Sequence, residues 1–348
     1  MERQSSRIYF EGKYHKDIYF QGHYHKAMYL TDSAGNPTLV WEKLGSQTEE
    51  FAFTILLTED PCLFRLFLCG SVDVDWGDGS SSGVSSEELA DQGHWYRGGG
   101  RYTVRIRGEL EDIGFISKPE VTRVLTAFPR TMNGKKDFRG MFEGCGIVAI
   151  PQGLFDNCPN ATDFSHVFSG CSITAIPQEL FDNCPNATDF SGAFSQNYSI
   201  KEIPRGLFDN CPNATDFSGV FSGCDNIVAI PSGLFDNCPN ATDFSHAFSS
   251  CYSIKEIPSG LFGNCPNATD FSHAFSSCYS IKEIPQGLFD NCPNASRFTD
   301  TFRYCKSVTS RVPELWETHP DASHSSCFLG CTSAANYHDI PNSWKNIF

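Results

Sequence analysis

Six nearly identical tandem blocks, each 26 or 27 residues long, fill the C-terminal half of this 348-residue chain and constrain its fold more than any other feature. The blocks begin at Phe142, Phe168, Phe194, Phe221, Phe248 and Phe275, and a degraded seventh begins at Phe302. A repeat of this length cannot bury its own apolar face, so it must stack on its neighbours. The blocks therefore predict a solenoid, which presents a long continuous surface and usually binds a partner.

Each block contains Phe-x-x-Cys followed by two isoleucines, and this pattern assigns an inward face to the coil. In the second block the residues expected to point inward are Ile173, Ile176, Leu180, Phe181, Ala187 and Phe190. A proline follows the second isoleucine in every block. Because proline cannot donate a ladder hydrogen bond, each short strand should end there. We expect a mainly β fold with short helical turns.

Twelve of the 16 cysteines fall into two columns with one cysteine per coil. Coils stack about 4.8 Å apart, so column neighbours are near enough to pair. Such a ladder nevertheless offers each thiol two equivalent partners, and Asn197 interrupts one column. We interpret the cysteines as buried, reduced thiols that pack as small hydrophobes. The spacing lacks close CxxC pairs, so no zinc, and no other metal or cofactor, is predicted.

Two polar columns accompany the cysteines. The asparagines are expected to hydrogen-bond the turn backbone of successive coils, and NAT, a glycosylation sequon, is read as part of the turn. Like charges at this spacing repel, so the aspartates are expected to be capped locally by Asx-type bonds, with bound Ca²⁺ as the alternative. The columns are Asn157, Asn183, Asn210, Asn237, Asn264 and Asn291, and Asp163, Asp189, Asp216, Asp243 and Asp270.

Residues 1–48 contain an internal echo, IYFEGKYHK and then IYFQGHYHK, in which aromatic and polar residues alternate. This favours a β-hairpin or meander with Gly12 and Gly22 in turns, followed by a strand at LVWEKLG. So small a module has little core, so we expect it to pack on a partner or on a homo-oligomer axis. In a trimer His23 and His25 would place six imidazoles around one metal ion, although a solvated edge is the favoured interpretation.

Residues 49–116 are predicted to form a small β-sandwich, from the strands FAFTILL, LFRLFLCG, VDVDWGDGS and GGGRYTVRIRGEL. Trp76 is expected to anchor the core, and Asp78-Gly79 suits a tight turn. For Asp73, Asp75 and Asp78, turn capping is favoured over Ca²⁺ binding.

Residues 117–348 are assigned to the solenoid and its caps. At the entry, Phe138 takes the place that Phe164 has one coil later. At the exit, a less regular segment with Trp316 and Trp344 is expected to cover the last open coil, because terminal repeats need caps.

These motifs resemble known families. The pattern F-x-x-C-x-(x)-I-x-x-I-P with NATDFSxxF before it, and the ending CFLGCTSAANYHDIPNSW, resemble BspA-type leucine-rich repeats. The pairing of WGDGS with a later GRYTVRI strand resembles the polycystic-kidney-disease-type (PKD) domain. The N-terminal segment is loosely similar to short modules of bacteriophage tail-associated proteins. The resemblance to BspA-type proteins implies adhesion to matrix, to host cells or to other microbes.

Charge and hydropathy exclude several partners. The formal net charge is −15 and no basic block occurs, which argues against nucleic acid and anionic membranes. The chain contains no run of about 18 apolar residues, so membrane insertion is not expected. Because the start lacks the apolar region of a signal peptide, we expect folding in the cytoplasm.

The catalytic motifs HExxH and the P-loop are missing from the sequence, which predicts a protein that is not an enzyme. An enzyme with its site in the PKD-like loop is the alternative from another class. His166, His246 and His273 share a repeat position with Gly192 and Gly219, so that position is not expected to be catalytic.

Positions that differ between blocks are the best candidates for a recognition surface, because the shared positions hold the coil together. We call this set the variable strip: Tyr198, Lys201, Glu202, Arg205, Tyr252, Lys255, Glu256, Tyr279, Lys282 and Glu283. The leading hypothesis is a non-enzymatic virion protein of a phage tail. Its N-terminal module would bind virion proteins, and its repeats would contact a cell-surface protein or glycan. The alternative is a bacterial cell-surface adhesin exported without a standard signal peptide.

Overall fold

The computed structural model describes the backbone of residues 7–10, 13–20, 23–31 and 37–42, and all atoms of residues 50–115 and 117–345. The chain divides into two compact units, Met1–Thr48 and Glu49–Phe348. The first holds an antiparallel meander in the order β1-β2-β3-β4, as expected from the aromatic alternation. Gly12, Gly22 and the side chains of His23 and His25 lie outside what the structure describes. The strands are β1 (Arg7–Phe10), β2 (Lys13–Phe20), β3 (His23–Thr31) and β4 (Pro37–Glu42).

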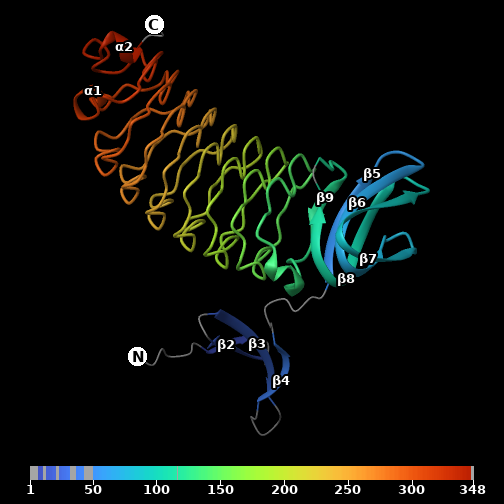
Figure 1. Cartoon of the computed structure of the whole chain (residues 1–348). Helices are drawn as coiled ribbons and strands as arrows, with labels where there is room; N and C mark the ends of the chain where they lie inside the picture. Colours follow the sequence, from blue (N-terminus) through green and yellow to red (C-terminus); the bar gives the residue numbers. More distant parts are fainter. Residues whose placement is uncertain are drawn as a thin grey trace. The chain divides into compact units, whose positions relative to one another are not determined.

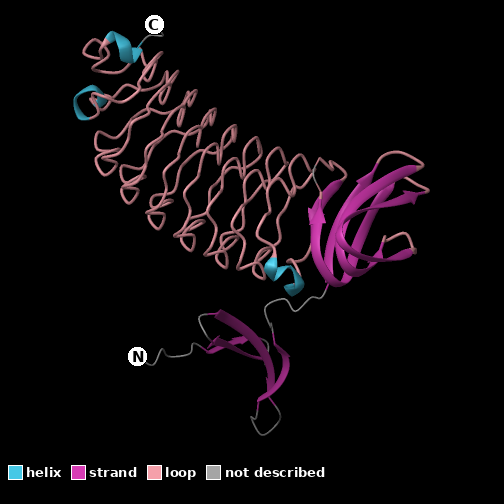
Figure 2. Ribbon diagram, in the orientation of Figure 1, coloured by secondary structure: helices cyan, strands magenta, loops and turns pink. Residues whose placement is uncertain are grey.

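The second unit begins with an open, five-stranded antiparallel sheet in the order β7-β6-β8-β5-β9 (Figure 2). The predicted β-sandwich is therefore wrong for residues 50–124, where the structure describes this one sheet. The sheet needs no second sheet to cover its apolar face, because the first coils cover it: Phe51 stacks on Phe128 at 4.8 Å, and Phe115 on Phe142 at 5.2 Å between ring centroids. The strands are β5 (Glu50–Leu57), β6 (Cys62–Asp75), β7 (Ser81–Tyr96), β8 (Gly100–Gly114) and β9 (Val121–Val124).

Glycines allow the paired strands β6 and β8 to come close together at an irregularity in their register. The register between them shifts between Cys69 and Gly70, and Gly70 has a φ of 122°. A Cβ at Gly70 would lie 2.0 Å from the carbonyl oxygen of Glu109, and a Cβ at Gly108 would lie 2.5 Å from that of Ser71. Only glycine fits so close an approach of two backbones. Trp76, the expected anchor, is 2% exposed within the resulting core.

The repeats form a stack of coils joined by backbone hydrogen bonds (Figure 1). On one side, parallel bridges pair Asp163 with Asp189, and likewise each neighbouring pair from Asp137 to Ser323. On the other, one or two N–H groups in most coils donate to the coil before, as from Lys282 to Lys255 at 3.2 Å and from Thr174 to Val148 at 3.2 Å. The strands expected to end at each proline are thus reduced to these few contacts and a bridge between Glu256 and Glu283, because too few backbone groups align on this side to make a regular strand.

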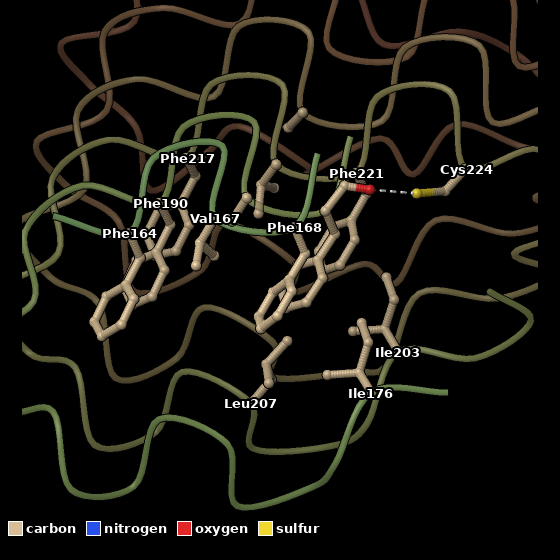
Figure 3. Packing of buried hydrophobic residues seen from close by; sticks show 14 of the residues in the cluster. Phe164, Val167, Phe168, Ile176, Phe190, Ile203, Leu207, Phe217, Phe221 and Cys224 are labelled. Carbon is tan, nitrogen blue, oxygen red and sulfur yellow. Dashed lines mark hydrogen bonds between the residues drawn. The ribbon is translucent and has the colours of Figure 1, made fainter. Parts of the chain in front are cut away.

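The interior of the stack is built from columns of phenylalanine. Phe164 stacks on Phe190 at 5.6 Å and Phe168 on Phe194 at 5.8 Å, and the same pairing repeats along the stack (Figure 3). Ile176 and Leu207 face these columns from the opposite side of the coil. The predicted inward residues are all buried, none more than 7% exposed. Each buried phenylalanine contributes about 1.5–3 kcal/mol of apolar burial, so the columns dominate the stability of the coils.

The cysteines are free and, apart from the half-buried Cys62, lie in the interior. They also do more than fill space. The first cysteine column, which Asn197 interrupts, consists of Cys145, Cys171, Cys224, Cys251, Cys278 and Cys305. Each of its thiols donates a hydrogen bond to an earlier phenylalanine carbonyl, which lies in the preceding coil for all but Cys145, as from Cys224 to Phe194 at 3.1 Å (Figure 3). Burial raises the pKa of Cys145, Cys158 and Cys224 to about 12. These thiols are therefore protonated at neutral pH and act as both packing groups and donors.

Asn197, which interrupts the first cysteine column, is completely buried. Its amide nitrogen donates to the carbonyl of Phe168 at 2.7 Å, the same kind of bond that the thiols make. Its amide oxygen accepts a hydrogen bond from the backbone N–H of Ile173 at 3.2 Å. Asn197 stands where a 26-residue block meets a 27-residue block, so its second bond satisfies an N–H of the shorter turn.

Both ends of the stack are covered. At the entry, Phe138 stacks on Phe164 at 5.5 Å, as expected, and a 3₁₀ turn at Arg130–Gly134 lies beside it in the chain. At the exit the chain forms α1 (Leu315–Thr318) and α2 (Asn342–Lys345). Trp344 is buried there, 6.2 Å from the ring of Phe328, while Trp316 packs at its edge.

Candidate binding surfaces

The variable strip lies on the outer surface of the coils, and every one of its ten residues is exposed. The backbone ladder runs from Lys201 to Val228, then to Lys255 and Lys282, with N–H to oxygen distances of 3.2–3.4 Å. One coil, carrying Val228, therefore separates Lys201 from the other two lysines. The structure brings the strip residues of two neighbouring coils together and leaves Tyr198, Lys201, Glu202 and Arg205 two coils away.

The tyrosines of the strip form its most ordered feature. The rings of Tyr252 and Tyr279 stack 5.0 Å apart with planes 3° from parallel, although these side chains are 40% and 39% exposed. The ammonium of Lys306 lies 5.2 Å above the Tyr279 ring and extends the stack by a cation–π contact. Tyr198 is 55% exposed. Aromatic side chains held rigid by stacking at a surface offer contact area at little cost in conformational entropy.

A second surface feature is a polar groove of about 780 Å³ that runs along the repeats. We call it the Asn/Thr groove; it is lined by Lys136, Asn160, Thr162, Asn186, Thr188, Asn213, Thr215, Asn240, Thr242 and Asn267. Asparagine and threonine stand two residues apart, and the alanine between them is buried, as Ala187 is. Both polar side chains of each NAT tripeptide therefore point outward.

Sequence reasoning missed this groove because it treated NAT as a turn. It also assigned the inter-coil asparagine bond to the wrong column. Of the Asn157 column, only Asn157 donates to a backbone carbonyl among the described residues. The regular ladder belongs to the asparagine three positions later: Asn213 donates to the carbonyl of Pro185 at 2.9 Å, and every block has the equivalent bond at 2.9–3.1 Å. The alternation of outward and inward residues in NAT was the usable signal.

The aspartate column beside the groove is capped locally, as expected. The Oδ1 atom of each accepts the N–H of the serine two residues on, at 2.8–2.9 Å. At the ends of the column, Arg139 pairs with Asp163 at 2.6 Å and Arg297 with Asp270 at 2.9 Å. In the middle, burial raises the pKa of Asp216 and the neighbouring aspartates add to the effect. The arginines thus neutralise only the ends of the column.

The WGDGS turn leads into the loop where the alternative interpretation, an enzyme, places its catalytic site. Asp75 and Asp78 cap it by accepting the N–H groups of Gly77 and Ser80 at 2.9 and 3.0 Å, so the capping prediction is confirmed for these two residues. It is wrong for Asp73, which lies inside β6 and pairs with Gly83 and Arg107 in the sheet. His94 stacks on Trp76, and its Nε2 lies 2.8 Å from Asp78 and 3.3 Å from the Ser80 hydroxyl. In a relay the acid and the nucleophile must use opposite ring nitrogens. Here both use Nε2, so this cluster does not have the geometry of a catalytic triad.

The repeat position shared by histidine and glycine has a conformational explanation. His246 and His273 have φ values of 57° and 58°, and Gly219 has 59° at the same position. Every block is therefore left-handed there, a conformation in which glycine is favoured and histidine is tolerated. The two histidine rings stack at 4.3 Å. The Gly/His alternation follows from the backbone rather than from catalysis.

Coils stacked in this way, with an ordered outer strip and a polar groove, define a binding or adhesion-type repeat protein. The model of the BspA type leucine rich repeat region matches residues 148–296 and 194–347, in six copies. These matches cover more than half of the chain, so the protein belongs to this family. A search of curated proteins found no match. In the part of the chain that the structure describes, no helix is long and apolar enough to cross a membrane.

Proposed function

We propose that the protein is a non-enzymatic adhesion protein that contacts a cell-surface protein or glycan through the variable strip. The observation that carries this proposal is the exposed, parallel-stacked pair Tyr252 and Tyr279 on neighbouring coils. Rigid aromatic anchors surrounded by charged side chains are typical of recognition surfaces. Lys255, Lys282 and their neighbouring glutamates supply both signs of charge, which favours specificity over tight non-specific binding.

The N-terminal unit, residues 1–48, is proposed to attach the protein to virion proteins of a phage tail. Support for this role comes from the loose resemblance of its sequence and from its small antiparallel meander, which offers an edge and two faces to a partner. The alternative is a bacterial cell-surface adhesin that uses the same repeats without a virion. Deleting residues 1–48 separates the two: particle association that survives the deletion would remove the attachment role.

The strip is tested with the full chain, labelled with a fluorophore and titrated against bacterial cells in a flow cytometer. The double variant Tyr252→Ser and Tyr279→Ser should lower the bound fraction at least about tenfold, because both central anchors are lost. Trp95→Ser is the matched control, since Trp95 is a 60% exposed aromatic on β7, the edge strand of the sheet opposite β9, and is not part of the repeats. Equal loss in both variants, or no loss in the tyrosine variant, would contradict the proposal.

A further inference from the structure

We propose that the Asn/Thr groove is a second binding site, and that its ligand is an extended, uncharged, hydroxyl-rich polymer, that is, a strand of neutral polysaccharide. The groove is separate from the variable strip: its residues belong to the Thr–Asp ladder, and those of the strip to the ladder between the two isoleucines. The proposal therefore does not depend on the function assigned to the strip.

The first argument is the hydrogen-bonding capacity that the groove leaves open. The Oγ1 of each lining threonine donates to the carbonyl of the preceding coil, as from Thr215 to Thr188 at 3.1 Å. One N–H of each lining asparagine is used in the same way. In the described residues, no donor lies within hydrogen-bonding distance of the amide oxygens of Asn186, Asn213 or Asn240.

Each level of the groove thus keeps an amide oxygen, the lone pairs of a threonine hydroxyl and one free amide N–H. A surface that both accepts and donates without charge matches hydroxyl groups, which also do both. Because the ladder bonds hold these side chains in one orientation, a ligand does not have to order them.

The second argument is charge. Among the lining residues only Lys136, at one end, is charged. The aspartate column follows the threonines in sequence, and within residues 50–115 and 117–345 no arginine pairs with its central members. The aspartate column would repel an anionic polymer along most of the groove. A site for a basic polymer would be expected to have carboxylates in its lining, and the lining of this groove contains none. The uncharged lining favours a neutral chain.

The third argument is periodicity. The lining residues come from six successive levels of the stack, from Lys136 to Asn267. Successive levels are separated by about 4.8 Å, the spacing of hydrogen-bonded neighbouring strands. One hexose of an extended, β-linked chain has a comparable length, so one sugar can lie at each level, and four of the levels offer both an asparagine and a threonine. Contacts that are weak singly then add along the chain, as in other multivalent binding.

The test uses the full chain and linear β-1,4-linked glucan and N-acetylglucosamine oligomers of two to eight sugars, measured by isothermal titration calorimetry. We expect affinity to rise with length and to level off near six sugars, the span of the groove. The triple variant Thr188→Val, Thr215→Val, Thr242→Val should bind the six-sugar chain at least about tenfold more weakly, since three hydroxyl acceptors are lost.

The matched control changes the same three threonines to serine, which keeps the hydroxyls and should keep binding within about threefold. If the valine variant does not fold, hydrogen exchange on the unchanged protein decides instead: the six-sugar chain should protect the backbone of the NAT segments. Failure of every oligomer to bind, binding that does not depend on length, or equal binding by the valine and serine variants would overturn the proposal. Loss of binding in the Tyr252→Ser, Tyr279→Ser variant would place the sugars on the strip and also overturn it.

Discussion

Replacing Asn197 by alanine should destabilise the stack far more than replacing any cysteine of the same column. Asn197 is completely buried, and its side chain bonds three backbone groups closely, with a longer contact to the Ser195 carbonyl at 3.4 Å. Its amide donates to the carbonyls of Phe168 at 2.7 Å and Phe194 at 3.0 Å, and it accepts the N–H of Ile173 at 3.2 Å. Alanine leaves the Ile173 N–H without a partner and the Phe168 carbonyl with only a long contact from Cys171 at 3.4 Å.

The expected cost follows from these two groups. A buried donor or acceptor left unsatisfied costs about 1–3 kcal/mol, so Asn197→Ala should lower the free energy of unfolding by about 2–6 kcal/mol. Cys251→Ala is the control: it removes one buried sulfur and a weak hydrogen bond to Phe221, with an expected cost of about 1–2 kcal/mol. Asn197→Cys should fall between them, because a thiol restores the donor to Phe168 but accepts poorly from Ile173.

The assay is urea unfolding followed by circular dichroism, with hydrogen exchange of the peptide that contains Ile173. In Asn197→Ala the midpoint should fall, and exchange at Ile173 should accelerate more than in Cys251→Ala. An alanine variant no less stable than Cys251→Ala would refute the reasoning. It would mean that the buried amide is replaceable packing rather than the link between turns of different length.

Three further predictions concern other parts of the second unit. Alkylation of the native protein with iodoacetamide at neutral pH should modify Cys62 first, because the other thiols are buried; early modification of repeat cysteines, seen by mass spectrometry, would contradict this. Partial burial by itself raises the pKa of Asp78, but hydrogen bonds from Ser80 and His94 outweigh it and lower the pKa to about 2. The resulting stabilisation should be complete above about pH 4 and be lost as the pH falls towards 2. The melting temperature of Asp78→Asn should therefore change less over that range than that of the unchanged protein. Finally, Ser250→Gly should raise the free energy of unfolding by up to about 1 kcal/mol, because Ser250 has a φ of 61°, and an unchanged or lower value would argue against left-handed strain.

Much of the fold was predictable from the repeats. Their period required stacking, and the apolar positions of one block gave the inward face, from Ile173 to Phe190. The buried, unpaired cysteines and the Asx caps of the aspartates were also predicted correctly, because both depend on local geometry that every block repeats. The sandwich prediction failed because residues 50–116 were considered without the coils that cover the sheet through Phe115 and Phe142.

The candidate binding surfaces were also predictable only in part. Differences between blocks pointed to the variable strip, and all its residues proved to be exposed, since positions that vary are those free of packing constraints. Which of them lie together was not predictable, because it depends on which coil is next to which. The stacking of Tyr252 on Tyr279 arises between residues 27 positions apart.

The sequence alone therefore determined that the chain stacks its repeats, which residues fill the interior and which positions vary. Only the tertiary structure decided where the polar groups of successive coils align. The Asn/Thr groove consists of identical tripeptides that look like simple turns one at a time. It becomes a surface only when backbone bonds between coils place them in line at a fixed spacing, because a hydrogen bond to the next coil is a property of the pair and not of the block.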